Sequence, residues 1–279
     1  MNVNETMGVT GADAGRVTGI GVGVNTNTGV GLGVSTDPGA VTVGRAGAAP
    51  DAGAGPDPDP GAPRFPRQRG ELLADIAAGY VKERQWDVFP GTWLEIVRGA
   101  ERCSCADVNC PSPGGHPARP DWAAQATGSG VVARRLWSKQ PHASILLPTG
   151  RTFDALDVPE TSGCLALARM ERLELSLGPV ASAPDGRMLF FVQPGAGSKV
   201  PDLVRQLGWT PSTLDLATRG VGAYVAAPPT RIGGRGPVQW VRRPTALNLW
   251  LPDVEELIRP LAYACGRDAA AGRMRRTAG

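Results

Sequence analysis

Aromatic residues are absent from the first 62 positions of the chain, although those positions hold 15 glycines. All seven tryptophans and all five phenylalanines lie beyond them. A segment without aromatic surface cannot bury enough apolar area to offset the entropy cost of ordering its backbone. We therefore expect residues 1–63 to form a disordered Gly/Pro-rich extension, residues 64–262 to form the folded domain, and residues 263–279 to form a flexible, arginine-rich tail.

Charge is distributed unevenly between the extension and the rest of the chain. Residues 1–62 carry two arginines against six acidic residues, so the formal net charge of +3 becomes +7 for the remainder. A positive excess of this size is compatible with a phosphate-bearing partner, but many enzymes that bind no nucleic acid carry as much. The charge therefore permits nucleic-acid binding without demonstrating it.

The apolar residues of the extension alternate with glycine and form no signal-peptide core, and no stretch approaches the roughly 18 apolar residues of a membrane span. We expect a cytoplasmic protein with no membrane partner. In that compartment, the five cysteines are expected to be free thiols or metal ligands rather than disulfides.

Short apolar strands alternate with amphipathic helices along the folded part, which predicts an α/β or α+β domain with a mixed sheet and flanking helices. The apolar spacing predicts helices over 71–85, 129–139, 164–175 and 201–207. It predicts strands over 86–90, 92–98, 143–147, 153–158, 188–193, 214–216 and 223–227.

A small loop between two of these segments is rich in metal-ligand residue types. It carries Cys103, Cys105, Cys110 and His116 within fourteen residues. Three thiolates and one imidazole are a suitable tetrahedral set for zinc, and four protein ligands would make the site structural rather than catalytic. The alternative is a loop with three surface thiols and an unrelated histidine, because Cys-x-Cys is less diagnostic than paired Cys-x-x-Cys.

Aspartates on predicted strands form a second candidate site. Asp154, Asp157 and Asp215 lie on or beside strand segments, although aspartate is a poor strand former. Converging carboxylates hold Mg²⁺ or Mn²⁺ in two-metal phosphoryl and nucleotidyl transfer. The alternative is that each aspartate caps a turn. Arg187 and Arg219 could present cations to a phosphate, or they could be solvated charges or members of surface ion pairs.

Several segments, read in order, carry a resemblance to a known family. They are Ala78-Gly79-Tyr80, Trp86–Pro90, the Cys/His loop ending at Pro117, Trp122–Thr127, Leu146–Gly150, and Gly222–Thr230 preceded by Leu214-Asp215-Leu216. Together they resemble the N-terminal domain of the bifunctional DNA primase/polymerases, the Prim-Pol branch of the archaeo-eukaryotic primase superfamily. The resemblance covers about Leu72 to Trp240.

This resemblance implies template-directed nucleotidyl transfer in DNA replication or repair, with Asp157 and Asp215 as catalytic ligands of Mg²⁺ or Mn²⁺. It implies single-stranded DNA or a primer–template and nucleotides as partners, with a separate helicase. The chain departs from the family pattern at two positions. Pro159 occupies the second position of the family's Asp-x-Asp strand, and Met188 stands where the family has a histidine thought to contact the incoming nucleotide.

Three hypotheses follow from these residues. The first is an active primase/polymerase that uses Asp157 and Asp215, with Arg187 or Arg219 neutralising the triphosphate. The second is a non-catalytic Prim-Pol-like accessory module that binds nucleic acid or nucleotides. The third is a zinc-stabilised interaction domain unrelated to the family.

Overall fold

The computed structural model describes residues 66–245 and 249–277. The extension predicted over residues 1–63 lies outside the described residues. The helices are α1 (Pro66–Arg84), α2 (Trp122–Gln125), α3 (Gly130–Lys139), α4 (Glu160–Arg172), α5 (Ala196–Gln206) and α6 (Val254–Thr277). The strands are β1 (Phe89–Pro90), β2 (Leu94–Val97), β3 (Ala100–Cys103), β4 (Ile145–Pro148), β5 (Asp154–Pro159), β6 (Val180–Ala183), β7 (Arg187–Val192), β8 (Ala217–Arg219), β9 (Tyr224–Ala226) and β10 (Gln239–Arg242).

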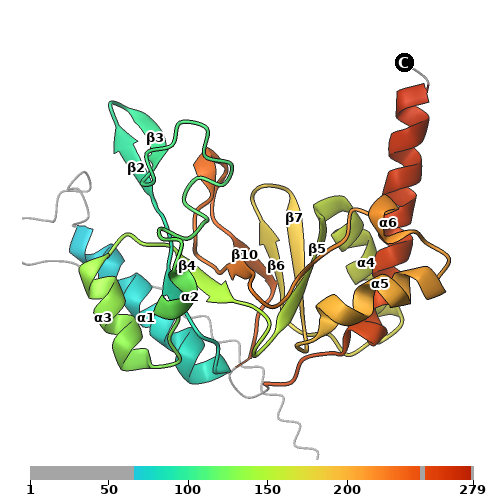
Figure 1. Ribbon diagram of the computed structural model, residues 1–279, viewed down its shortest axis with the longest axis horizontal. Helices are drawn as coiled ribbons and strands as arrows, with labels where there is room; N and C mark the ends of the chain where they lie inside the picture. The colour runs from blue at the N-terminus through green and yellow to red at the C-terminus, as the bar shows by residue number, and fades with distance from the viewer. Residues whose placement is uncertain (1–65, 246–248, 278–279) are drawn as a thin grey trace, which may run out of the picture. The chain divides into compact units, whose positions relative to one another are not determined.

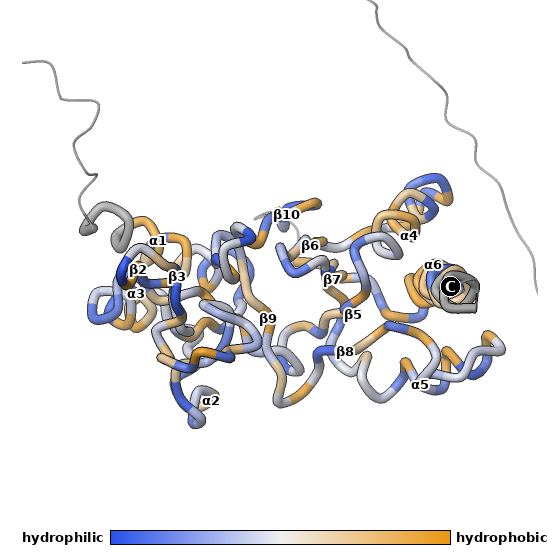
Figure 2. Tube along the Cα trace, turned by 90° about the horizontal axis from the view of Figure 1, so that it is seen from above, coloured by the Kyte–Doolittle hydropathy of each residue, from blue (hydrophilic) through white to orange (hydrophobic). Residues whose placement is uncertain are grey.

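Two antiparallel sheets and a hairpin organise the domain. The smaller sheet has the order β1-β4-β9, the larger has the order β10-β6-β7-β5-β8, and β2 pairs with β3 in the hairpin. Helices α4, α5 and α6 lie along one side of the larger sheet (Figures 1 and 2), while α1 and α3 pack together beside the smaller sheet (Figure 1). The α/β architecture with flanking helices predicted from the sequence is confirmed.

The larger sheet is buried on both faces by two separate apolar cores. Side chains in a strand alternate between faces, so Leu156 and Val158 of β5 join one core while Ala155 joins the other. The first core includes the helices α4 to α6, and the second lies between this sheet, the smaller sheet and α1. Asp157 shares its face with Ala155, which points its carboxylate away from the three helices.

Aromatic stacking fills the core between the two sheets. Trp86 is 2% exposed, and its ring centroid lies 4.8 Å from that of Phe153 and 5.2 Å from that of Phe191. Tyr80 donates its hydroxyl hydrogen to the Pro228 carbonyl at 2.8 Å, which ties α1 to the segment after β9. These aromatic residues join α1 and the two sheets in one core.

The chain passes between the two sheets at two neighbouring turns. One connects β4 to β5 and the other connects β8 to β9, and Thr149 joins them by donating its hydroxyl to the Gly220 carbonyl at 2.6 Å and its backbone N–H to the Ala223 carbonyl at 3.0 Å. Gly150 adopts φ +96°, and a Cβ at this position would lie 2.4 Å from Cα of Val221. Only glycine fits this close approach of two backbones.

The structure differs from the sequence-based expectation at several elements. Residues 214–216 are not a strand, because the chain makes a 3-10 turn over Pro211–Thr213 and β8 begins only at Ala217. Strands β3, β6 and β10 were not expected, since each is a four-residue segment without a distinct apolar alternation.

The C-terminal segment also differs from the tail expected over residues 263–279, because α6 continues as a helix to Thr277. Ala264 and Cys265 are buried against α4 and α5. The Asp268 carboxylate accepts hydrogen bonds from the hydroxyls of Thr161 and Ser162, at 2.7 and 2.5 Å, so this part of α6 is fastened to the start of α4. Within residues 66–245 and 249–277, none of the helices combines the length and the apolar composition that a membrane-spanning helix needs.

Replacing Gly150 with alanine is expected to destabilise the domain by about 3 kcal/mol, because left-handed backbone strain adds to a steric clash with Val221. The matched control is Gly99→Ala in the β2–β3 turn. Gly99 has φ +81°, but a Cβ added to it would meet nothing within 4 Å, so only the strain applies and the cost is about 1 kcal/mol. Denaturant unfolding, followed by circular dichroism, gives the free energy of unfolding of both variants. Equal losses in the two variants would contradict a close contact between the paired turns at Gly150.

Candidate active-site cleft and metal centre

Asp157 lies on β5, next to the edge strand β8 of the larger sheet, between two strands that each supply an arginine. The β5 residue Asp157 pairs with Leu189 of β7 on one side and with Ala217 of β8 on the other. It is 2% exposed. A buried carboxylate must be neutralised or fully hydrogen-bonded, and here each neighbouring strand supplies an arginine that does so.

Two guanidinium groups hold the Asp157 carboxylate. Arg187 of β7 donates from Nε to Oδ1 at 2.6 Å, and Arg219 of β8 donates to Oδ2 from Nε at 2.9 Å and from Nη2 at 2.6 Å. A further bond runs from Nη2 of Arg187 to the Asp157 backbone carbonyl at 3.1 Å. Charge-assisted bonds of this kind are stronger than neutral ones. Each carboxylate oxygen of Asp157 is thus engaged by an arginine.

Asp215 joins the same cluster from outside the sheet. Nη1 of Arg187 lies 2.8 Å from its Oδ1 and 3.0 Å from its Oδ2, so this guanidinium bridges Asp157 and Asp215. The Asp215 side chain is 65% exposed, compared with 3% for that of Asp157. Burial acts to lower the pKa of Arg187, but hydrogen bonds to the two carboxylates outweigh it and raise the pKa above its ordinary value.

These four residues, the Asp157–Asp215–Arg187–Arg219 quartet, are the residues that the sequence nominated for metal and phosphate binding. The structure brings them together, but in pairs of opposite charge. Three of them, Asp157, Arg187 and Arg219, line a cleft of about 230 Å³. Sequence reasoning missed three further residues of this cleft: Tyr224 of β9, Ser112 of the Cys/His loop, and Asp185 of the β6–β7 turn.

A two-metal centre needs carboxylate oxygens that coordinate the ions and one carboxylate that bridges them. In the quartet, Asp157 and Asp215 direct their oxygens at guanidinium groups instead. Asp185 is a further carboxylate of the cleft, but it is exposed and, among the described residues, makes no hydrogen bond or ion pair with the quartet. As they are arranged, these residues do not fit a pair of divalent ions.

The acidic neighbours of Asp157 in sequence serve other roles. Asp154 is 1% exposed and faces the helices, where its Oδ2 accepts hydrogen bonds from the backbone N–H groups of Gly195 at 3.0 Å and Gly197 at 3.4 Å. A carboxylate at this position stabilises the N-terminus of α5. Glu160 accepts a hydrogen bond from the Ser182 hydroxyl at 2.9 Å. Neither residue contributes to the cleft.

Met188 and Pro159, the two departures from the family pattern, occupy different faces of the sheet. Met188 is 2% exposed and packs on Gly163 of α4. A Cβ added to Gly163 would lie 2.6 Å from the sulfur of Met188. Its side chain therefore faces the helices, and the residues of β7 that line the cleft are Arg187 and Leu189. Pro159 pairs with Arg187 at the end of β5 and precedes α4.

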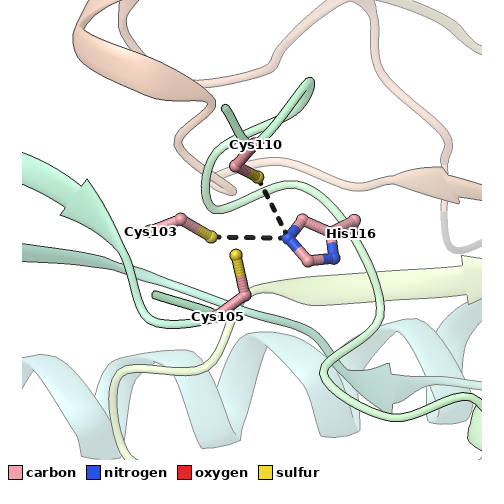
Figure 3. Close-up of side chains that lie close together, drawn as sticks. All are labelled: Cys103, Cys105, Cys110 and His116. Carbon is pink, nitrogen blue, oxygen red and sulfur yellow. Dashed lines mark hydrogen bonds between the residues drawn. The ribbon is translucent and has the colours of Figure 1, made fainter. Parts of the chain in front are cut away.

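The Cys/His loop forms a compact ligand cluster (Figure 3). One ligand atom from each of Cys103, Cys105, Cys110 and His116 lies within 4.8 Å of the others, so the set can hold a metal ion. Nε2 of His116 is 3.4 Å from Sγ of Cys103 and 3.3 Å from Sγ of Cys110. Its Nδ1 lies 2.9 Å from the Pro117 carbonyl, and a bond there leaves Nε2 free for a metal.

Backbone donors also prepare one thiol of this cluster for coordination. Burial acts to raise the pKa of Cys103, but hydrogen bonds from the backbone N–H groups of Cys105 and Gly114 contribute to lowering it to about 6. For Cys110, burial and the neighbouring thiols raise the pKa. The thiolate is the form that binds metals, so Cys103 is the ligand most ready to coordinate.

Comparison with known proteins assigns a family to this arrangement. The family model described as "Bifunctional DNA primase/polymerase, N-terminal" matches residues 77–253, a span that contains the Cys/His loop and the whole quartet. No curated protein matched significantly. Membership of a DNA primase/polymerase family implies nucleic acid and nucleotides as the general kind of partner, and it excludes the hypothesis of a domain unrelated to that family. The chain belongs to the Prim-Pol family.

Proposed function

We propose that this chain is a Prim-Pol module that binds the phosphates of nucleotides and single-stranded nucleic acid without catalysing metal-dependent nucleotidyl transfer. The observation that carries the proposal is the engagement of both Asp157 oxygens by Arg187 and Arg219. A module of this kind would act beside a polymerase or helicase supplied by another chain.

Loss of catalysis follows from the energetics of the quartet. A metal ion at Asp157 would have to displace at least one arginine from a carboxylate that is 2% exposed. Removing one partner from a buried charge pair typically costs about 3–5 kcal/mol, so the ion would have to bind strongly enough to offset the lost arginine hydrogen bonds. With Pro159 in place of a second strand-borne carboxylate, the bridging ligand that would offset this cost is missing.

Phosphate binding follows from the exposure of the same arginines. The Arg219 side chain is 48% exposed at the cleft. Its bonds to Asp157 use Nε and Nη2 but not Nη1. Arg187 shares one guanidinium nitrogen with the exposed Asp215 carboxylate, which can move away when a phosphate arrives. Asp157 alone cannot neutralise two arginines, so an anion that replaces Asp215 restores the charge balance.

A second candidate function is active nucleotidyl transfer. It is favoured by the convergence of Asp157 and Asp215 on Arg187, beside a cleft that Asp157 and Asp185 line. A metal–triphosphate complex could exchange partners with the quartet, with its phosphates taking the arginines and its metal taking the carboxylates. The two candidates therefore make opposite predictions about activity and about the need for a divalent ion.

Primer extension on a single-stranded DNA template with Mg²⁺ and with Mn²⁺ separates the candidates. We expect no incorporation by folded protein, but we expect the protein to bind a labelled oligothymidine in fluorescence anisotropy without added divalent ions. In Arg219→Gln, the loss of one phosphate contact should reduce the slope of log affinity against log salt by about 0.7. Arg235→Gln, an exposed arginine outside the quartet, is the matched control. Incorporation by the wild-type protein would establish the catalytic candidate instead.

We further propose that the Cys/His loop holds a structural zinc ion. A tetrahedral ion with Zn–S bonds of about 2.3 Å and Zn–N bonds of about 2.0 Å separates its ligand atoms by roughly 3.3–3.8 Å. The sulfur–nitrogen distances of 3.3 and 3.4 Å at His116 agree with this geometry. Because Ser112 and Gly115 of the same loop line the cleft, the ion would also fix one wall of the phosphate site.

Replacing Cys110 with serine is expected to abolish zinc binding, because a hydroxyl is a poor ligand for zinc in place of a thiolate. The wild-type protein should contain about one zinc ion per chain by elemental analysis. Cys164→Ser, at an exposed cysteine of α4, is the matched control and should keep the metal. Wild-type protein that is well folded but free of metal would refute the zinc assignment.

A further inference from the structure

The cleft that holds the quartet arginines also has an aromatic wall. Tyr224 lies on β9 of the smaller sheet and lines the cleft together with Arg187 and Arg219 of the larger sheet. Side chains alternate along a strand, so Tyr224 points to the opposite face of β9 from Val225, which is 3% exposed in the core between the sheets. The cleft thus joins cations from one sheet to an aromatic ring from the other, and the phosphate binding proposed above uses only the cations.

Two aromatic neighbours hold the Tyr224 ring in place. Its centroid lies 5.6 Å from that of Trp122 in α2 and 6.1 Å from that of Phe89 in β1, at interplanar angles of 71° and 86°. Edge-to-face contacts of this kind are favourable for aromatic pairs. Trp122 also stacks on the fully buried Phe89, at a centroid distance of 4.6 Å. The Tyr224 ring is therefore fixed on a buried support, and neither of these neighbours lies parallel to it.

The charge state of Tyr224 suits a phosphate ligand. Burial raises the pKa of Tyr224, and this outweighs the opposite effect of the Arg219 charge. The phenol therefore stays neutral at physiological pH, whereas a phenolate would repel a phosphate in the same cleft. The Arg219 side chain is 48% exposed, and its bonds to Asp157 do not use Nη1. A neutral ring and a cation that can meet a phosphate thus occur together in one cleft.

From this arrangement we infer that the cleft takes a nucleoside phosphate whose base stacks on Tyr224 while its phosphate meets Arg187 and Arg219. The inference rests on the phosphate binding proposed above, and it adds the residue that recognises the nucleoside. Every base has a π-face, so stacking on one aromatic ring accepts all four bases with little discrimination among them. Tyr224 therefore distinguishes nucleoside phosphates from inorganic phosphates rather than one base from another.

Three probes, all used without added divalent ions, test the role of the ring. Inorganic triphosphate and dATP are measured by isothermal titration, and a labelled oligothymidine is measured by fluorescence anisotropy. In Tyr224→Leu, the side chain stays apolar but loses its π-face. The affinity for the nucleoside-phosphate ligand should fall about tenfold, as expected when one stacked base is lost. The affinity for triphosphate should change by less than about twofold, because both arginines remain.

The two nucleoside-phosphate probes distinguish the source of the ligand. A loss confined to dATP identifies a free nucleotide, and a loss for oligothymidine identifies one nucleotide of a single strand. Tyr224→Phe keeps the ring and should bind within about twofold of the wild type. The matched control is Tyr263→Leu, at a tyrosine of α6 that is 42% exposed and lies outside the cleft, and this variant should keep all three affinities.

The outcomes separate this inference from the phosphate binding on which it rests. If wild type bound triphosphate but Tyr224→Leu matched it for dATP and oligothymidine, phosphate binding would stand and stacking on Tyr224 would be wrong. An equal loss of triphosphate affinity in the variant would also overturn the inference, since the ring would then act only on the arginines. If Tyr224→Leu did not fold, wild type alone would decide: either dATP or oligothymidine should bind more tightly than triphosphate, and the inference is wrong if neither does. Wild type that bound none of the probes would overturn both proposals.

Discussion

The buried carboxylate of Asp157 is the constraint around which the candidate site is built. A charge that is 2% exposed on a strand of a five-stranded sheet must be compensated, and Arg187 and Arg219 do so from the two strands that flank it. This arrangement fixes β7 and β8 against β5 by side-chain bonds as well as by the sheet itself. It also engages both carboxylate oxygens of Asp157 with arginines, so a divalent ion at this position would have to displace one of them.

The rest of the domain retains what such a site would require. Two sheets meet across an aromatic core, and the paired turns at Gly150 and Gly220 carry the chain between them. The Cys/His loop forms part of the cleft wall, so a metal ion there would support the cleft without taking part in chemistry. The fold of the Prim-Pol family is thus present, and the loss of catalysis that we propose concerns only the quartet at its centre, since fold alone does not determine function.

Sequence patterns predicted most helices and most of the buried strands, because their apolar spacing is regular, but the short buried strand β6 was missed. The strand expected at 214–216 was wrong, since Asp215 lies in an irregular segment after a 3-10 turn and β8 follows it. The metal cluster was foreseeable because all four ligands lie in one short loop. The pairing of Asp157 with Arg187 and Arg219 was not, because the partners are 30 and 62 residues away and only the strand register brings them together. The placement of Met188 on the helix-facing side of β7 likewise required that register.

The most direct test of this account is the affinity of Asp215→Asn for dATP, measured by isothermal titration with and without Mg²⁺ or Mn²⁺. Asp215 is exposed, so the variant should fold as the wild type does. If Asp215 competes with phosphate for Arg187, removing its charge should tighten binding about threefold without any added divalent ion. If Asp215 is a metal ligand of an active polymerase, the variant should bind more weakly than wild type, and wild-type binding should depend on the added ion. That second result would contradict the account.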